Sequence, residues 1–184
     1  MIPNEQTVHE LWDKYALSEV KRNHSQLVAN VALFLATRVC QAAHVSIDTN
    51  LLYIGALLHD IDKNTQKQEG EHHPATGVRI LRELGFDEVA DLIKTHSLPA
   101  ILDQTIAPST WEEKLLFLAD KMVKHSVITV DERFALWRHE ALPQAALEGL
   151  DQTYPKVKRL ETEVFSLIGM LPKDVASLLR NASA

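Results

Sequence analysis

Histidine and aspartate side chains occur in this chain at positions where the pattern predicts apolar core. Residues 51–58 are almost continuously apolar, and this run ends at His59 and Asp60. Burial of an unpaired carboxylate is strongly unfavourable, so a buried carboxylate is normally paired, hydrogen-bonded or bound to a metal ion. The doublet therefore indicates either a local hydrogen-bonded arrangement or a set of metal ligands.

Three further ionisable residues share this property. His24 precedes the apolar residues of its helical stripe by three, four and seven positions, and His96 follows a similar stripe at the same intervals. Asp120 follows Leu116 and Phe117, which places this carboxylate on an inward face as well. Each residue alone could be a core residue satisfied by hydrogen bonds. One shared divalent cation would satisfy all of them together, and mixed histidine and carboxylate ligation suits zinc, iron or manganese.

The bulk properties narrow the class of protein. The chain has 184 residues with 19 basic and 25 acidic side chains, and its net charge of −6 argues against a nucleic-acid backbone as partner. Cys40 is the only cysteine, so no intrachain disulfide forms, as is typical of a reducing cytosol. The N-terminus lacks the pattern of a secretory signal, and no apolar run looks long enough to cross a bilayer. We therefore expect a cytoplasmic, soluble protein.

The helical period dominates the whole chain, and strand-like alternation is scarce. Capping boxes are expected to pair Thr110 with Glu113 and Thr129 with Glu132, and Asp48 and Asp87 are expected as N-caps. The pattern predicts an all-α protein with seven to nine helices. The expected helices cover about 7–16, 18–43, 49–62, 74–85, a segment after residue 87, segments after each capping box, 143–168 (divided at Pro155 or continuous) and 173–181.

In this order, His24, the His59-Asp60 doublet and Asp120 resemble the signature of the HD-domain superfamily of metal-dependent phosphohydrolases. The flanking strings "RNHSQLVANVA", "LLHDIDK" and "EKLLFLADKMV" agree with that signature. The resemblance covers about residues 20–125. It implies an HD-like helical bundle that forms one domain over residues 1–184, with helices in 129–181 packed on the family-like core.

The resemblance also implies the ligands. "HHPATGVRI" and "IKTHSL" look like the segments that bring a second metal in the binuclear branch of the family, and Asp60 would then bridge the two metals. His73 fits the ligand position better than His72, although the adjacent pair leaves both open. The implied cofactor is a divalent transition metal, with iron favoured over manganese, zinc or nickel. The implied metal ligands are His24, His59, Asp60, His73, His96 and Asp120.

Lys63 separates branches of the family. With a lysine three positions after the doublet, the sequence resembles the branch that includes symmetrical dinucleoside-tetraphosphate hydrolases. The nucleotidase and ppGpp-hydrolase branches commonly carry an acidic residue at that position. No "GYP" string is present, which argues against a cyclic-di-GMP phosphodiesterase of that type. Lys63 could contact a substrate phosphate beside the catalytic Asp60, or it could be a solvated lysine at a helix C-terminus. Arg22 is a second candidate phosphate contact.

These features predict a phosphohydrolase that cleaves a phosphomonoester, phosphodiester or phosphoanhydride bond of a nucleotide-like substrate with metal-activated water. The expected partner is a small phosphorylated molecule rather than nucleic acid or a membrane. The amphipathic C-terminal stretch leaves a homodimer open. Two alternatives stand beside this prediction: a catalytically silent nucleotide- or metal-binding sensor module, and a helical interaction domain whose histidines are satisfied locally.

Overall fold

The computed structural model of the protein describes residues 1–182, and α-helix is the main secondary structure in this range. No strand occurs in it, apart from an isolated bridge between Val123 and Val127, which confirms the all-α prediction. Nine α-helices and two short 3-10 helices (η) are described: α1 (Glu5–Lys14), α2 (Glu19–Ala43), α3 (Thr49–Leu58), α4 (Ala75–Glu83), α5 (Asp87–Lys94), η1 (Leu98–Leu102), α6 (Trp111–Lys121), α7 (Val130–His139), α8 (Gln144–Ile168), η2 (Pro172–Asp174) and α9 (Val175–Ala182).

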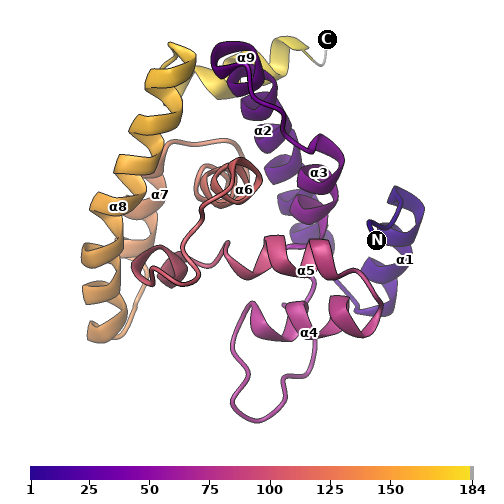
Figure 1. Ribbon diagram of the computed structural model, residues 1–184. Helices are drawn as coiled ribbons and strands as arrows, with labels where there is room; N and C mark the ends of the chain where they lie inside the picture. The colour runs from indigo at the N-terminus through magenta and orange to yellow at the C-terminus, as the bar shows by residue number, and fades with distance from the viewer. Residues whose placement is uncertain (183–184) are drawn as a thin grey trace.

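Helix α6 lies at the centre of the molecule (Figure 1). The α2–α3 pair lies on one side of it, α7 and α8 lie on the other, and α5 crosses beside it with α4 below. Five successive residues of α6, 115–119, are fully buried, so the helix is apolar on all sides except near its ends. Asp120 follows directly after this buried run. The central position of α6 therefore brings Asp120 close to segments from several other helices.

The predicted helix starts are largely confirmed. Both capping boxes form, with the hydroxyl of Thr110 and that of Thr129 each accepting the backbone N–H three residues on. Asp48 caps α3 by accepting the Leu51 N–H at 2.9 Å. The expectation for Asp87 was wrong, because Phe86 occupies the N-cap position of α5 and Asp87 is the first helical residue.

Two boundaries also differ from expectation. Helix α3 ends at Leu58 instead of continuing to about residue 62, since the chain tightens into successive turns over residues 59–64. Of the two alternatives for α8, the continuous helix forms: it runs unbroken through Pro155, which is exposed and leaves out only one helical N–H donor. The last helix starts at Val175, after the turn η2.

A glycine brings α3 and α5 close together. An ideal Cβ built on Gly55 would lie 2.4 Å from Cδ2 of Leu92, a separation that real Cβ atoms do not adopt. The helices therefore pack backbone against side chain at this point. As a result, the C-terminal ends of α3 and α5 lie side by side, and the histidines that follow each helix, His59 and His96, meet.

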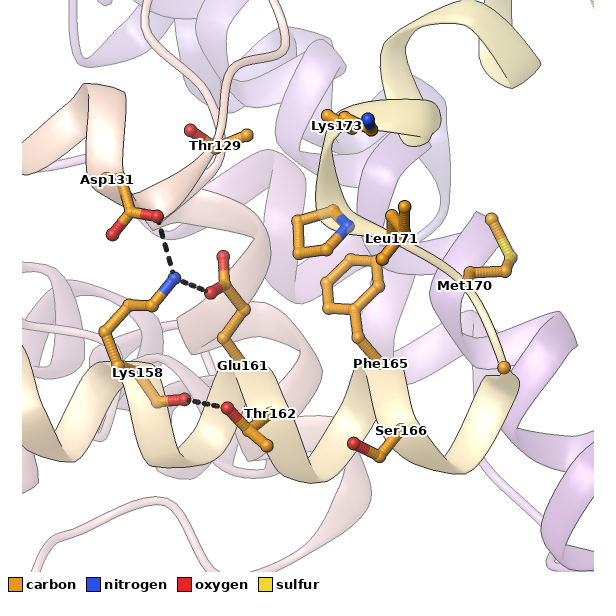
Figure 2. A pocket seen from close by; sticks show the side chains of 12 residues that line it. Thr129, Asp131, Lys158, Glu161, Thr162, Phe165, Ser166, Met170, Leu171 and Lys173 are labelled. Carbon is orange, nitrogen blue, oxygen red and sulfur yellow. Dashed lines mark hydrogen bonds and ion pairs between the residues drawn. The ribbon is translucent and has the colours of Figure 1, made fainter.

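Helix α7 is fixed to α8 by an ion cluster (Figure 2). Lys158 of α8 contacts both Asp131 of α7, at 3.0 Å, and Glu161. The Tyr154 hydroxyl donates to the same Asp131 carboxylate at 2.7 Å. Together with the capping box at Thr129, these contacts fix the position of α7 at its first turn.

Helix α2 corrects one expectation. By length and composition alone it is long and apolar enough to cross a membrane, whereas we expected no such stretch. Its buried face, which includes Val28, Val31 and Leu35, packs on α3, α6 and α8. A core helix of a soluble protein meets the same criterion, so packing within this bundle accounts for the apolar composition.

Candidate metal centre

The structure brings all six predicted ligands together from five helical segments. Five of them supply ligand atoms to two groups, each with its members within 4.8 Å of one another, and both groups contain Asp60. The first group adds His24 and His59, and the second adds His73 and His96. His72 is exposed and belongs to neither group, so the geometry selects His73 of the adjacent pair.

Two of the imidazoles are oriented by the helices that precede them. Nδ1 of His59 lies 2.7 Å from the carbonyl oxygen of Ala56, and Nδ1 of His96 lies 2.5 Å from that of Ile93. A carbonyl oxygen only accepts, so Nδ1 carries the proton in both rings and Nε2 presents a lone pair. Nε2 of His59 is buried without a hydrogen-bond partner among the described residues. A cation at this position would satisfy it.

The contacts of His73 also indicate a cation site. Its Nδ1 lies 2.8 Å from Oδ1 of Asp62, and its Nε2 lies 2.9 Å from Nε2 of His96. Burial keeps the pKa of His96 well below its ordinary value, so that ring is neutral. Two lone pairs facing each other at this separation repel unless a cation lies between them. About 3 Å is also the separation of two imidazole nitrogens bound to one metal ion.

The carboxylates complete the cluster. Oδ1 of Asp120 lies 3.1 Å from Nε2 of His24 and 3.5 Å from Nε2 of His59. Burial tends to raise the pKa of Asp120, but the adjacent ammonium of Lys121, the hydrogen bond with His24 and the nearby ring of His59 hold it well below the ordinary value. The pKa of Asp60 is likewise lowered in spite of burial, chiefly by His59 and Lys63. Both groups are therefore anionic, as ligands of a divalent ion must be.

The same carboxylates shift the pKa of His59 upward. Burial lowers the pKa of a histidine, yet Asp60 and Asp120 raise the pKa of His59 above its ordinary value. The field at its Nε2 thus favours a positive charge, whether a proton or a metal ion. The donor set of imidazole nitrogens and carboxylate oxygens fits a divalent transition metal.

A cavity of about 280 Å³ opens onto this cluster. Lys21 and Lys63 line it and contact Asp60, with Nζ of Lys21 2.8 Å from Oδ2 and Nζ of Lys63 3.4 Å from Oδ1. The prediction for Arg22 was wrong in its placement. Its guanidinium is turned to Asp13, at 2.7 Å, and to the Leu17 carbonyl, because the neighbouring Lys21 occupies the inward position on that turn of α2.

Comparison with known proteins identifies the fold family. The model of the HD domain matches residues 22–125, more than half of the chain and the whole of the segment that supplies the clustered ligands from His24 onward. The chain belongs to the HD-domain family.

Two relatives of this HD domain have different names. It is 28% identical over 180 residues to a tRNA (cytidine(56)-2'-O)-methyltransferase of Thermoplasma volcanium, and the match covers 92% of this chain and 49% of that protein. It is 32% identical over 121 residues to an uncharacterized protein of Methanocaldococcus jannaschii, with 60% of this chain and 70% of that protein covered. The chain thus spans about half the length of the first relative. No solved structure matches it.

Several residues around the HD-domain cluster escaped prediction. Asp62 is fully buried against His73, and Lys121 is buried with its ammonium bonded to Asp120, at 2.8 Å, and to the His96 carbonyl. Arg133 and Trp137 of α7 also line the cavity. The sequence indicated a role for Asp62 and Lys121 only through their positions beside predicted ligands, because a sequence does not show which charged residues become buried. It held no feature that placed Arg133 or Trp137 at the site.

Proposed function

We propose that the protein is a metal-dependent phosphohydrolase that acts on a small organic phosphate, a nucleotide or a close analogue. The observation that supports this proposal is the pair of ligand groups that share Asp60. Two bound divalent ions would supply an activated water and would neutralise charge that develops on the phosphoryl oxygens. Iron is the preferred metal, with manganese, zinc or nickel as alternatives.

The residues of the site have two roles in this proposal, metal binding and phosphate binding. His24, His59, His73, His96 and Asp120 would hold the metals, together with Asp60, which belongs to both ligand groups. Lys63 and Lys21 hold positive charge at the mouth of the cluster, where either ammonium can turn from Asp60 to a substrate phosphate once metal ions neutralise that carboxylate. The small volume of the cavity favours a phosphate group over a large polymer.

The test is hydrolysis by the purified protein loaded in turn with Fe²⁺, Mn²⁺ and Zn²⁺. The panel comprises nucleoside mono-, di- and triphosphates, dinucleoside polyphosphates, and the phosphomono- and phosphodiesters of p-nitrophenol. We expect metal-dependent product release that His59→Ala abolishes and that His139→Ala, an exposed histidine of α7, leaves unchanged. Absence of release with every metal would overturn the proposal.

A sensor module that binds a phosphorylated ligand without turnover is the second candidate. It is favoured by the match to half of a Thermoplasma volcanium protein whose name gives a different activity, since a similar segment there is part of a larger protein. The same panel separates the two candidates. Stabilisation of the metal-loaded protein by a nucleotide without product release would favour the sensor.

A further inference from the structure

Arg133 is an unusual residue among those that line the cavity. It lies on α7, beyond the segment that the HD-domain model matches, and its guanidinium carbon is 4.6 Å from the centroid of the Trp137 ring. Both side chains form part of the same wall of the cavity that contains the ligand cluster. Membership of the family therefore assigns no role to either residue.

The guanidinium of Arg133 has no anionic partner in contact. Arg22, Arg79, Arg82 and Arg138 each form an ion pair with a carboxylate at 2.7 to 3.1 Å. The Arg133 side chain forms neither an ion pair nor a hydrogen bond with any residue that the structure describes, and its Nε and Nη1 are buried without acceptors. A half-buried cation with unsatisfied donors is unfavourable for folding, so stability does not explain it.

The other cations of the cavity are already engaged. Lys21 and Lys63 contact Asp60, and Lys121 contacts Asp120 and the His96 carbonyl. Among the lysine and arginine residues that line the cavity, Arg133 is thus the one without an ion-pair partner. The carboxylates of Asp120, Glu140 and Asp60 act on it only from a distance, and burial lowers its pKa.

Stacking on Trp137 does not use the donors of the guanidinium. A guanidinium that lies over an aromatic ring leaves its N–H groups in the guanidinium plane free to donate, and this planar fork matches two oxygens of a phosphate. Helix α7 is fixed at its first turn by the capping box and by the ion cluster of Asp131 with Lys158 (Figure 2), and the buried Phe134 anchors the same turn. The residue is therefore held on a rigid element.

We propose that Arg133, stacked on Trp137, is a phosphate-binding residue of the cavity that donates to two oxygens of the phosphate bound over the ligand cluster, beside the contacts that Lys21 and Lys63 can make. The inference rests on the proposed function for its consequence in turnover. It specifies how the substrate is recognised: the guanidinium fork takes two non-bridging oxygens of one phosphate, which phosphomonoesters, phosphodiesters and nucleotide phosphates all provide. Arg133 acts in substrate binding, while the metal ligands act in the chemical step.

The experiment measures the affinity of the Mn²⁺-loaded protein for inorganic phosphate by isothermal titration calorimetry. We expect Arg133→Gln to raise the Kd about tenfold or more, as is typical for loss of hydrogen bonds to a charged group. Arg133→Lys keeps the charge without the fork and should show an intermediate Kd. Arg138→Gln, on the same helix but paired with Asp151, is the matched control and should leave the Kd unchanged.

Kinetics and stability complete the test. For any substrate that the wild type hydrolyses, we expect Arg133→Gln to raise KM by a similar factor and to change kcat less. The melting temperature of this variant should equal or exceed that of the wild type, because an unsatisfied cation is removed. A loss of stability with unchanged phosphate affinity in Arg133→Lys would assign the residue to packing and would overturn the inference.

The outcomes also separate this inference from the proposed function. If the wild type hydrolyses nothing, the function fails, but the phosphate Kd values still decide the role of Arg133. If the wild type hydrolyses a substrate while Arg133→Gln keeps both the Kd and the KM of the wild type, the function stands and the inference fails. A wild type that binds no phosphate at millimolar concentration would also overturn the inference.

Discussion

Oδ1 of Asp62 lies 2.8 Å from Nδ1 of His73, on the side of the imidazole away from the ligand cluster. The carboxylate is fully buried and follows the His59-Asp60 doublet by only two residues. It fixes the His73 tautomer so that Nε2 faces the cluster. A carboxylate that orients a ligand histidine in this way also increases the basicity of the ring.

The first prediction concerns this carboxylate. Asp62→Asn keeps the shape of the side chain but removes its charge, so we expect the affinity of the His73 and His96 group for Mn²⁺ to fall about 10- to 100-fold. Calorimetric titration of the metal-free protein measures the change. Asp103→Asn, in an exposed turn, is the control. Equal affinities in Asp62→Asn and wild type would show that the carboxylate does not act on a bound metal.

The second prediction concerns metal content. Because Asp60 belongs to both ligand groups, Asp60→Ala should lose bound metal from both, whereas His96→Ala should lose only the part held by the second group. His72→Ala, an exposed neighbour of His73, should keep the content of the wild type. Elemental analysis of the purified proteins gives the metal-to-protein ratios. Equal losses in His96→Ala and Asp60→Ala would contradict two separable sites.

The third prediction concerns the buried Lys121. Lys121→Met keeps most of the apolar volume but leaves the Asp120 carboxylate and the His96 carbonyl without the ammonium, so we expect the free energy of unfolding to fall by about 3 kcal/mol. Urea denaturation of the metal-free protein measures this change. Lys124→Met breaks only a partly exposed pair with Glu140 and should change the free energy by less than about 1 kcal/mol. Similar losses in the two variants would contradict the special role of Lys121.

The fourth prediction concerns the loop that carries His73. Hydrogen bonds from Arg79 lower the pKa of Glu71 to about 2, and Glu71 thereby joins this loop to α4. Since the pKa in the folded state is depressed, the stabilisation is complete above the ordinary pKa of about 4.5 and is lost as the pH falls toward 2. Metal-free wild type should therefore exceed Glu71→Gln in melting temperature at pH 6, and the difference should shrink between pH 4.5 and 2. A difference that stays constant over this interval would contradict the assignment.

The sequence predicted those parts of the fold and site that depend on local pattern. Capping boxes at Thr110 and Thr129 use a side chain and a backbone N–H three residues apart, so they can be identified without tertiary structure. The inward phase of His24 and His96 is equally local. By contrast, the end of α3 could not be predicted from local pattern. The apolar pattern of a helix continues past Leu58, whereas the chain itself forms turns there that direct His59 and Asp60 toward other helices.

The remaining part of the site depends on contacts between distant segments. Lys21 and Arg22 are adjacent cations on one turn of α2, and only the packed structure shows that the first faces Asp60 and the second faces Asp13. Arg133 and Trp137 are separated from the last predicted ligand by a loop and a helix start. Their approach to the cavity is set by the docking of α7 on α8, for which the sequence pattern holds no direct signal.

The close contact of Gly55 with Leu92 also bears on the spacing of two candidate ligands. His59 and His96 each follow a helix, and each ring is bonded to a carbonyl of its own helix, so the distance between the rings follows the distance between α3 and α5. Apolar side-chain volume one helical turn before each histidine thus helps to set the separation of the two rings. A substitution at this interhelical contact would therefore move His59 relative to His96 while every candidate ligand is retained.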